Sequence, residues 1–341
     1  MKGSVSKGTS EILSTALNLR DDDIREILST NRGFDNPQQW IDYARLHGFK
    51  VVKARLLLEC PECGSRSSRV LGQFVYYSQL SRLRKCRKCK LIYSDVVVDS
   101  TVIQNHFESA YKDVAYFQRR QRTIFNHIVE IVEENCRDRS SVIDIGGGMG
   151  HLASLIRPRR PDCEITFSDI SQRSCEHASS FFEINSVCCA LENLWQEGRR
   201  YDTLLMVDVL YYVQDLPGAW RSILACSSSD AELILRIPNK IWWIELRQFF
   251  RRHMPSAKMM DRIVGMNPEH LYVFSHSYLK RKLKELGFKS VKFIPSPFTD
   301  SSNPIKSRLL RVVYLASVSI HAATLGLCCL TPSQIVIARR K

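Results

Sequence analysis

Between residues 141 and 238, short apolar runs alternate with stretches of helical periodicity. The apolar runs are SVIDI, CEITFSD, YDTLLMVDV and AELILRIP. Strands that alternate with helices predict a parallel sheet joined by crossover helices, with helices on both faces. A further apolar run near the end of the chain, SQIVIARR, has the composition of a strand that would close this sheet. The fold class is therefore α/β.

Upstream of the sheet, the apolar spacing is helical. Six large apolar residues recur at helical spacing in residues 101–140 and predict a helical linker. They are Phe107, Tyr111, Phe117, Ile124, Ile128 and Ile131. Residues 1–55 are predicted to form short helices, because three aspartates at 21–23 precede apolar positions and a second apolar stripe follows from Trp40 to Leu46. This N-terminal segment would be a small helical prelude or a dimer arm.

These patterns divide the chain into four parts. They are an N-terminal helical segment (1–55), a cysteine-paired subdomain (56–100), the helical linker (101–140) and the sheet domain (141–341). Within the sheet domain we expect a lid insertion at about 239–270 and an apolar helix at about 306–330.

Composition narrows the class of protein. The chain has 341 residues, of which 44% are apolar, so it can bury a sizeable core, and disordered, collagen-like and low-complexity classes are excluded. The net charge of +14 is uneven: residues 60–95 hold eight basic against two acidic residues, and residues 236–341 hold 19 against five. Such charge favours nucleic acid, an anionic membrane surface or an acidic substrate as partner, unless it is only a solvated surface.

Two features bear on location. The N-terminus lacks the apolar core of a signal peptide, and the 12 cysteines follow no disulfide framework, which favours a reducing, cytoplasmic compartment. Residues 312–330 carry no formal charge, and this stretch is long enough for a membrane span. Ser317, Ser319, His321 and Thr324 interrupt the stretch, so a packed or membrane-associated interfacial helix is favoured over a crossing.

Two CxxC pairs carry the first candidate chemistry. Each pair places two thiolates on one tight turn, and four thiolates complete a tetrahedral zinc shell. The expected ligands are Cys60, Cys63, Cys86 and Cys89, with 22 residues between the pairs. Such a site would be structural, because four cysteines leave no open position. The alternative is a metal-free ribbon of reduced thiols, and redox chemistry is disfavoured because no βαβ context surrounds either pair.

A glycine-rich turn follows the first strand of the sheet. The pattern D-x-G-x-G-x-G places Asp144, Gly146, Gly148 and Gly150 between a strand and a helix, so that the backbone can approach a ligand closely. The spacing disfavours NAD, and no phosphate-binding P-loop follows. Asp169 ends the next strand, where an acid typically holds the hydroxyls of a ribose. The alternatives are a loop-capping role for Asp144 and a solvated surface role for Asp169.

This arrangement resembles the class I S-adenosylmethionine-dependent methyltransferases, whose sheet is Rossmann-like. The order of parts is similar to a bacterial group with an N-terminal four-cysteine zinc ribbon. The shared motifs are Tyr111, Tyr116 and Phe117, then Pro238–Asn239, P-E-H-L-x-x-F from Pro268 to Phe274, and Leu286–Phe288. The resemblance implies S-adenosylmethionine as cofactor.

The resemblance also implies roles for individual residues. Asp144 and the three glycines would lie against the methionine part of the cofactor, and Asp169 would bind the ribose. Glu192 would lie near the adenine, although the family's usual preceding Asp is absent. Asp208 would lie near the methionine or the substrate, or be a buried structural acid. Tyr211 and Tyr212 stand where many relatives have Glu and His.

Methyl transfer needs an aligned acceptor, exclusion of water and, for a hydroxyl or carbon acid, a general base. His270 is the first candidate for that base, with Tyr211 and Tyr212 next; a satisfied structural His is the alternative. The basic aromatic segment Ile241–Met254 would be a lid, a membrane contact or a nucleic-acid contact.

The sequence therefore predicts a methyltransferase acting on a small molecule, a sugar or a glycan- or lipid-linked acceptor in a biosynthetic pathway. Peripheral membrane contact would run through 241–254 and 309–330. An RNA methyltransferase that uses the basic ribbon and tail is the alternative. It is disfavoured because the strand YDTLLMV leads into DVLYY and not into an Asn/Asp-Pro-Pro-Tyr-like loop for flipped bases. A non-catalytic protein that has kept the fold is the third hypothesis.

Overall fold

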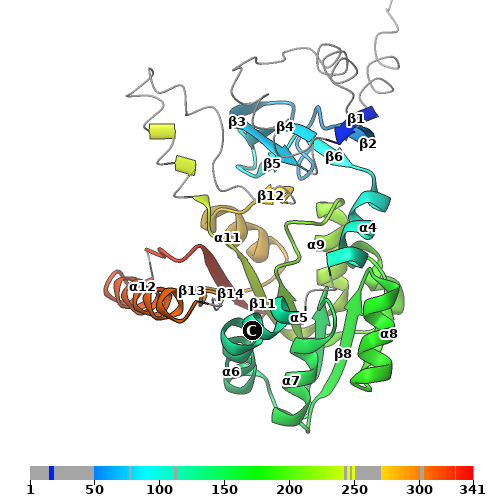
Figure 1. The fold of residues 1–341 in the computed structure, drawn as a ribbon, viewed down its shortest axis with the longest axis vertical. Helices are drawn as coiled ribbons and strands as arrows, with labels where there is room; N and C mark the ends of the chain where they lie inside the picture. The colour runs from blue at the N-terminus through cyan, green and yellow to red at the C-terminus, as the bar shows by residue number, and fades with distance from the viewer. Residues whose placement is uncertain are drawn as a thin grey trace, which may run out of the picture. The chain divides into compact units, whose positions relative to one another are not determined.

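The computed structural model describes residues 15–18, 50–76, 79–110, 114–241, 244–245, 248–249, 270–299, 303–326 and 328–340. These residues form two compact units, which are described separately (Figure 1). One unit comprises Met1–Ile103 with Ile241–Val273, and we call it the ribbon unit. The other comprises Gln104–Lys240 with Phe274–Lys341, and we call it the sheet unit.

The sheet unit contains a seven-stranded mixed sheet in the order β13-β14-β11-β10-β7-β8-β9. The strands are β7 (Ser141–Ile145), β8 (Glu164–Asp169), β9 (Asn185–Cys188), β10 (Tyr201–Val207), β11 (Ser227–Pro238), β13 (Ser290–Pro295) and β14 (Ser333–Arg339). Strands β9, β8, β7, β10 and β11 are parallel, and β14 is antiparallel to both of its neighbours. The α/β prediction and all five expected strands are confirmed; β9 and β13 were not predicted.

Helices cover the sheet. They are α7 (His151–Arg159), α8 (Gln172–Phe181), the 3-10 helix η2 (Leu191–Glu197), α9 (Leu216–Cys226), α11 (His276–Glu285) and α12 (Pro304–Ala323). The expected linker forms α4 (Ser100–Ala110), α5 (Val114–Arg120), the π-helical turn η1 (Gln121–Phe125) and α6 (Asn126–Asn135). Ile128, Ile131 and Val132 of α6 are buried and join the same apolar core as Val142 of β7 and Ile156 of α7.

The strand order reverses between β7 and β10. From β7 the chain builds outward through β8 to β9, and it then crosses to β10 and builds through β11 on the other side. In open α/β sheets, ligands bind at such a reversal, outside the carboxyl ends of the strands. Asp144 lies on β7 and Asp208 directly follows β10, so both acids belong to this region.

The ribbon unit contains two small sheets. One has the order β1-β2-β6 (Thr15–Asn18, Lys50–Leu56, Val96–Val98), and the other β12-β5-β4-β3 (Tyr272–Val273, Ile92–Ser94, Gln79–Cys86, Ser68–Tyr76). The helices expected near residues 21–28 and 40–46 lie outside the described residues, and the described parts of 1–55 are strands.

Strand β12 comes just after the segment, about 239–270, that was expected to be a lid insertion of the sheet domain. It pairs with β5, with Tyr272 opposite Tyr93 and Val273 opposite Ile92. The backbone N–H of Ser94 also donates to the carbonyl of Leu271 at 2.8 Å. The chain therefore leaves the sheet after β11 and adds a strand to the ribbon before it returns at α11.

Candidate cofactor and metal sites

The glycine turn has the backbone that its sequence predicts. Gly146, Gly148 and Gly150 all adopt left-handed conformations, with φ of 65°, 62° and 79°. Only glycine enters this region without a steric penalty. Gly147 is required for a different reason, because a Cβ there would lie 2.4 Å from Oδ2 of Asp144. This role was not foreseen, although the three consecutive glycines were visible in the sequence.

Asp144 is a buried carboxyl group beside this turn. Its side chain is almost fully buried, and no donor among the described residues reaches either carboxylate oxygen. Burial, together with the charge of Asp169, raises the pKa of Asp144 to about 7. A buried acid without hydrogen bonds is costly unless a ligand supplies its partner. Asp144 is therefore suited to bind a cation or a strong donor from outside the chain.

Asp169 connects the glycine turn to the following helix. Its Oδ2 accepts a hydrogen bond from the backbone N–H of Gly148 at 3.0 Å, and its Oδ1 accepts one from Ser171 at 2.9 Å. Ser171 in turn caps α8 through its hydroxyl, which accepts from the N–H of Ser174. Each carboxylate oxygen has a second lone pair, so Asp169 still has the capacity to accept from a ligand.

Glu192 is the second residue of the 3-10 helix η2, which follows β9, and it is partly buried. Its Oε1 accepts a hydrogen bond from the backbone N–H of Asp215 at 3.2 Å. Asp215 itself caps α9 by accepting from the N–H of Gly218 at 3.0 Å. Glu192 thus has a structural contact, which leaves its second carboxylate oxygen for other partners.

Asp208 lies between two buried arginines. It accepts from Arg120 at 2.7 Å, and Arg236 donates to the same oxygen. Burial opposes ionisation, but the charges of Arg236 and Arg120 hold the pKa of Asp208 below its ordinary value. Arg236 also donates to the hydroxyl of Ser296 at 2.8 Å. The backbone of Asp208 is left-handed, with φ of 65°, a conformation that Asp and Asn adopt more readily than other non-glycine residues.

Arg120 and Arg236 were not identified from the sequence as partners of Asp208. Arg120 ends α5 immediately before the π-helical turn, and such turns occur often at functional sites. Arg236 lies in the apolar run AELILRIP, where a charged residue in a buried strand was a visible signal. Arg120 stands in the run RRQR, where the sequence does not distinguish one arginine from its neighbours.

Tyr211 and Tyr212 follow Asp208. Their ring centroids are 4.5 Å apart, and Phe107 of α4 meets Tyr212 edge-on at 5.2 Å. Burial and the nearby charge of Asp208 raise the pKa of Tyr211 well above its ordinary value. Tyr211 therefore stays protonated at neutral pH and would act as a hydrogen-bond donor rather than as a base.

His270, the other candidate base, belongs to the ribbon unit. It is buried and lies two residues before β12. The structure thus groups the two tyrosines with Asp208 in the sheet unit and places His270 among the residues of the ribbon unit.

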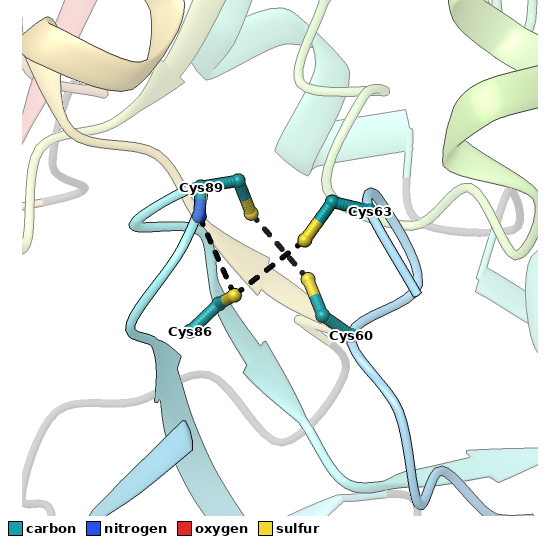
Figure 2. A group of neighbouring side chains, drawn as sticks. All are labelled: Cys60, Cys63, Cys86 and Cys89. Atoms are coloured by element: carbon teal, nitrogen blue, oxygen red, sulfur yellow. Dashed lines mark hydrogen bonds between the residues drawn. The ribbon is translucent and has the colours of Figure 1, made fainter. Parts of the chain in front are cut away.

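The four predicted cysteines form one cluster. Figure 2 shows their sulfur atoms pointing toward a common centre, with 3.5 Å between those of Cys60 and Cys89 and 3.6 Å between those of Cys63 and Cys86. All four sulfurs lie within 4.8 Å of one another. Four thiolates bound to zinc at about 2.3 Å form a tetrahedron with edges of about 3.8 Å. The cluster therefore fits a zinc ion without rearrangement.

Two matching turns produce this cluster. The N–H of Gly64 donates to the carbonyl of Cys60 at 2.9 Å, and the N–H of Lys90 donates to that of Cys86 at 3.2 Å. Gly64 and Lys90 both have left-handed backbones, with φ of 65° and 66°. Lys90 thus takes the conformation that glycine takes in the first turn.

Comparison with known families decides what the sheet unit is. The family described as "Methyltransferase domain" matches residues 116–292, which is just over half of the chain. The chain belongs to this family. Its sheet unit, with the glycine turn and the acids of β7, β8 and β10, is a class I S-adenosylmethionine-dependent methyltransferase domain.

Named methyltransferases show the same likeness. A malonyl-[acyl-carrier protein] O-methyltransferase of Acetivibrio thermocellus is 25% identical over 140 residues, which are 40% of this chain and 49% of that enzyme. A histamine N-methyltransferase of Cavia porcellus is 24% identical over 149 residues, which are 37% of this chain and 51% of that enzyme. The chain spans about half the length of these relatives. A methyltransferase structure from Thermotoga maritima covers 70% of this chain and 99% of its own, with 14% identity and a TM-score of 0.44.

The residues of this methyltransferase domain fit S-adenosylmethionine. The methionine part of that cofactor carries an ammonium group, which matches the unpartnered carboxyl of Asp144. The left-handed glycines leave the turn without Cβ atoms, so the backbone can approach the ligand closely.

The ion cluster around Asp208 gives a stability prediction for this domain. Asp208→Asn keeps a residue that tolerates the left-handed backbone but removes the charge between two buried guanidinium groups. We expect the free energy of unfolding, measured with urea, to fall by about 3–5 kcal/mol. The double variant Asp208→Asn, Arg236→Met should lose less, because one of the unpaired charges is gone.

The matched control is the exposed ion pair between Glu133 and Arg159, whose atoms lie 2.8 Å apart. Glu133→Gln should cost clearly less stability than Asp208→Asn, since solvent screens an exposed pair. A loss for Asp208→Asn no larger than that of the control would contradict the assignment.

Proposed function

We propose that the protein transfers a methyl group from S-adenosylmethionine to a small molecule, a sugar or a glycan- or lipid-linked acceptor in a biosynthetic pathway. The observation that carries the cofactor assignment is Asp144, a buried acid beside the glycine turn that has no donor among the described residues. We further propose that Asp169 accepts from the ribose hydroxyls and that Glu192 lies beside the adenine. The cofactor supplies an activated methyl group, so the chain has to align the acceptor and exclude water.

Asp208, Tyr211 and Tyr212 would form the wall near the methyl group. Asp208 is held by Arg120 and Arg236 and is unsuited to take a proton, since its pKa is lowered. Tyr211 keeps its proton and would donate to the acceptor or the cofactor. The general base, where the acceptor needs one, is assigned to His270 of the ribbon unit.

The RNA alternative depends on the basic charge of the ribbon, and part of that charge is neutralised within the ribbon itself. Asp95 is buried and pairs with Arg82 at 2.7 Å and with Arg84 at 3.0 Å. Lys85 lies 3.7 Å from Glu245. Charges that are paired in this way contribute less to phosphate binding, which depends on the number of free cations. The ribbon therefore supports the small-molecule or glycan acceptor more than RNA.

We also propose that the ribbon holds one structural zinc ion and that the protein acts in the cytoplasm, with peripheral membrane contact. All 12 cysteines are free thiols, which suits a reducing compartment. Of the two regions expected to contact membrane, 241–254 lies largely outside the described residues, and 309–330 overlaps helix α12.

Zinc analysis tests the metal proposal. The full chain purified without chelators should contain about one zinc ion, measured by atomic absorption. Cys60→Ser should lower the zinc content and the unfolding temperature, because three thiolates bind zinc less tightly than four. Cys188→Ser is the control, since Cys188 is exposed and outside the cluster. Zinc far below one ion per chain in the unaltered protein would reject the site.

The pH dependence of cofactor binding tests the role of Asp144. Below its raised pKa of about 7 the carboxyl is neutral, and above it the carboxylate attracts the ammonium of S-adenosylhomocysteine. Affinity measured by calorimetry should therefore rise from about pH 6 to about pH 8. Asp144→Asn should remove this rise and weaken binding roughly 10–100-fold at the higher pH, as expected for a lost charge-assisted hydrogen bond.

Methylthioadenosine is the control ligand because it lacks the amino-acid group. Its affinity should not follow the ionisation of Asp144. In the ligand-free protein the sign is opposite: the folded pKa of Asp144 lies above its unfolded value, so stability falls as the pH rises through about 7. An Asp144→Asn variant with unchanged affinity and unchanged pH dependence would contradict the assignment.

Transfer of labelled methyl groups tests the acceptor class. The protein and methyl-labelled S-adenosylmethionine are incubated with an extract that is then separated into RNA, lipid and water-soluble small molecules. Label in the lipid or small-molecule fraction supports the proposal, and label in RNA supports the alternative.

His270→Ala should lower kcat by roughly 100–10,000-fold if the residue is the base, with zinc content unchanged. Near-normal turnover of that variant would remove the role of His270.

A further inference from the structure

Helix α12 presents an apolar face to solvent. Ile305, Leu309 and Val312 are 76%, 62% and 62% exposed, and Val313 and Ile320 on the same face are also exposed. Their spacing of three and four residues places them in one row along the helix. Ala316 and Ala323 fill the positions between them and are exposed as well.

The opposite side of α12 faces the protein and is mixed, with Leu310 and Val318 partly buried beside the polar residues. Ser317 is the buried residue of the helix, and its hydroxyl donates to the carbonyl of Val313 at 2.7 Å. His321 is half-buried, with Nδ1 at 3.0 Å from the carbonyl of Cys328, and Tyr314 is also half-buried. A surface helix normally turns its apolar stripe inward. In α12 apolar residues lie on both sides, so packing on the sheet does not account for the exposed row.

Cations flank the apolar row. Lys306, Arg308 and Arg311 are all exposed. No Asp or Glu follows Asp300 in the sequence, so none of these cations has an acidic neighbour within the helix. An apolar stripe bordered by Lys and Arg is typical of helices that lie in the interface of a membrane with anionic lipids.

The positive charge of α12 distinguishes between two possible partners of its apolar face, a second copy of the chain and an anionic bilayer. A second copy that packed α12 against α12 would bring the same cations together without any acid on the helix to pair with them. Among the described residues, no helix is long and apolar enough to cross a membrane. An anionic bilayer surface satisfies both the apolar row and the cations.

We propose that α12 docks the protein on the surface of an anionic lipid bilayer, with Ile305, Leu309, Val312, Val313 and Ile320 inserted among the lipid headgroups. Lys306, Arg308 and Arg311 bind lipid phosphates at the border of the inserted face. This inference rests on the proposed peripheral membrane contact, whose site and lipid it names, and it holds whichever acceptor is methylated.

Co-sedimentation of the full chain with vesicles tests the proposal. The protein should pellet with vesicles of equal parts phosphatidylglycerol and phosphatidylcholine, and much less with vesicles of phosphatidylcholine alone. The double variant Leu309→Glu, Val312→Glu should bind the mixed vesicles at least about tenfold more weakly, because two inserted side chains are lost. Arg308→Gln with Arg311→Gln should weaken binding by roughly tenfold and reduce its dependence on salt.

The matched control is Phe181→Glu. Phe181 is 72% exposed on α8, which packs against β9, whereas α12 packs against β13; these are the two edge strands of the sheet (Figure 1). This variant removes a similar exposed apolar side chain and should leave vesicle binding unchanged. Unchanged calorimetric affinity for S-adenosylhomocysteine establishes that each variant is folded, because α12 is outside the cofactor site.

Three results would overturn the proposal. The first is that the unaltered protein fails to pellet with mixed vesicles, or pellets equally with both kinds. The second is that the Leu309→Glu, Val312→Glu variant binds as well as the unaltered protein. The third is that analytical ultracentrifugation without lipid shows a dimer that this variant abolishes, which would assign the apolar row to a second copy.

Discussion

Asp208 holds two arginines that come from distant parts of the chain, and the arrangement of the methyltransferase domain depends on this ion cluster. Arg120 ends helix α5 of the linker, and Arg236 lies in β11 and reaches Ser296 beyond β13. Taking these charges out of water is costly, and only a close and well-bonded geometry compensates for it. The cluster therefore fixes the linker at the carboxyl end of β10, where the strand order of the sheet reverses.

The acids on the neighbouring strands, Asp144 and Asp169, differ in their hydrogen bonds. Asp169 is satisfied by two backbone N–H groups and stabilises the glycine turn, whereas Asp144 has no donor among the described residues. Burial and the charge of Asp169 both disfavour the ionisation of Asp144, so its pKa rises. This burial costs stability in the ligand-free protein, and a bound cation would offset the cost.

Local patterns in the sequence were enough to predict the parts that depend on neighbouring residues. The glycine turn and the cysteine turns are set by φ angles and spacing, and both appear where the sequence indicated. The short strands β9 and β13 are only partly buried and lack the continuous apolar run of the predicted strands, so they were missed. Arg120 could not be identified because its partner is 88 positions away in the chain. Long-range pairing of this kind depends on tertiary structure, which local periodicity does not contain.

The pairing of β12 shows that the unit containing the cysteine cluster is built from two separate stretches of the chain. The ribbon would be a separable N-terminal module if its strands all came from one stretch of chain. Instead β12 pairs with β5, β5 pairs with β4, and β4 ends at Cys86. His270 lies two residues before β12, and the carbonyl of the intervening Leu271 accepts from the backbone N–H of Ser94 of β5. A metal ion that stabilises the turn at Cys86 would therefore also stabilise the strand that follows His270, so the position of His270 within the ribbon unit would depend on the cysteine cluster.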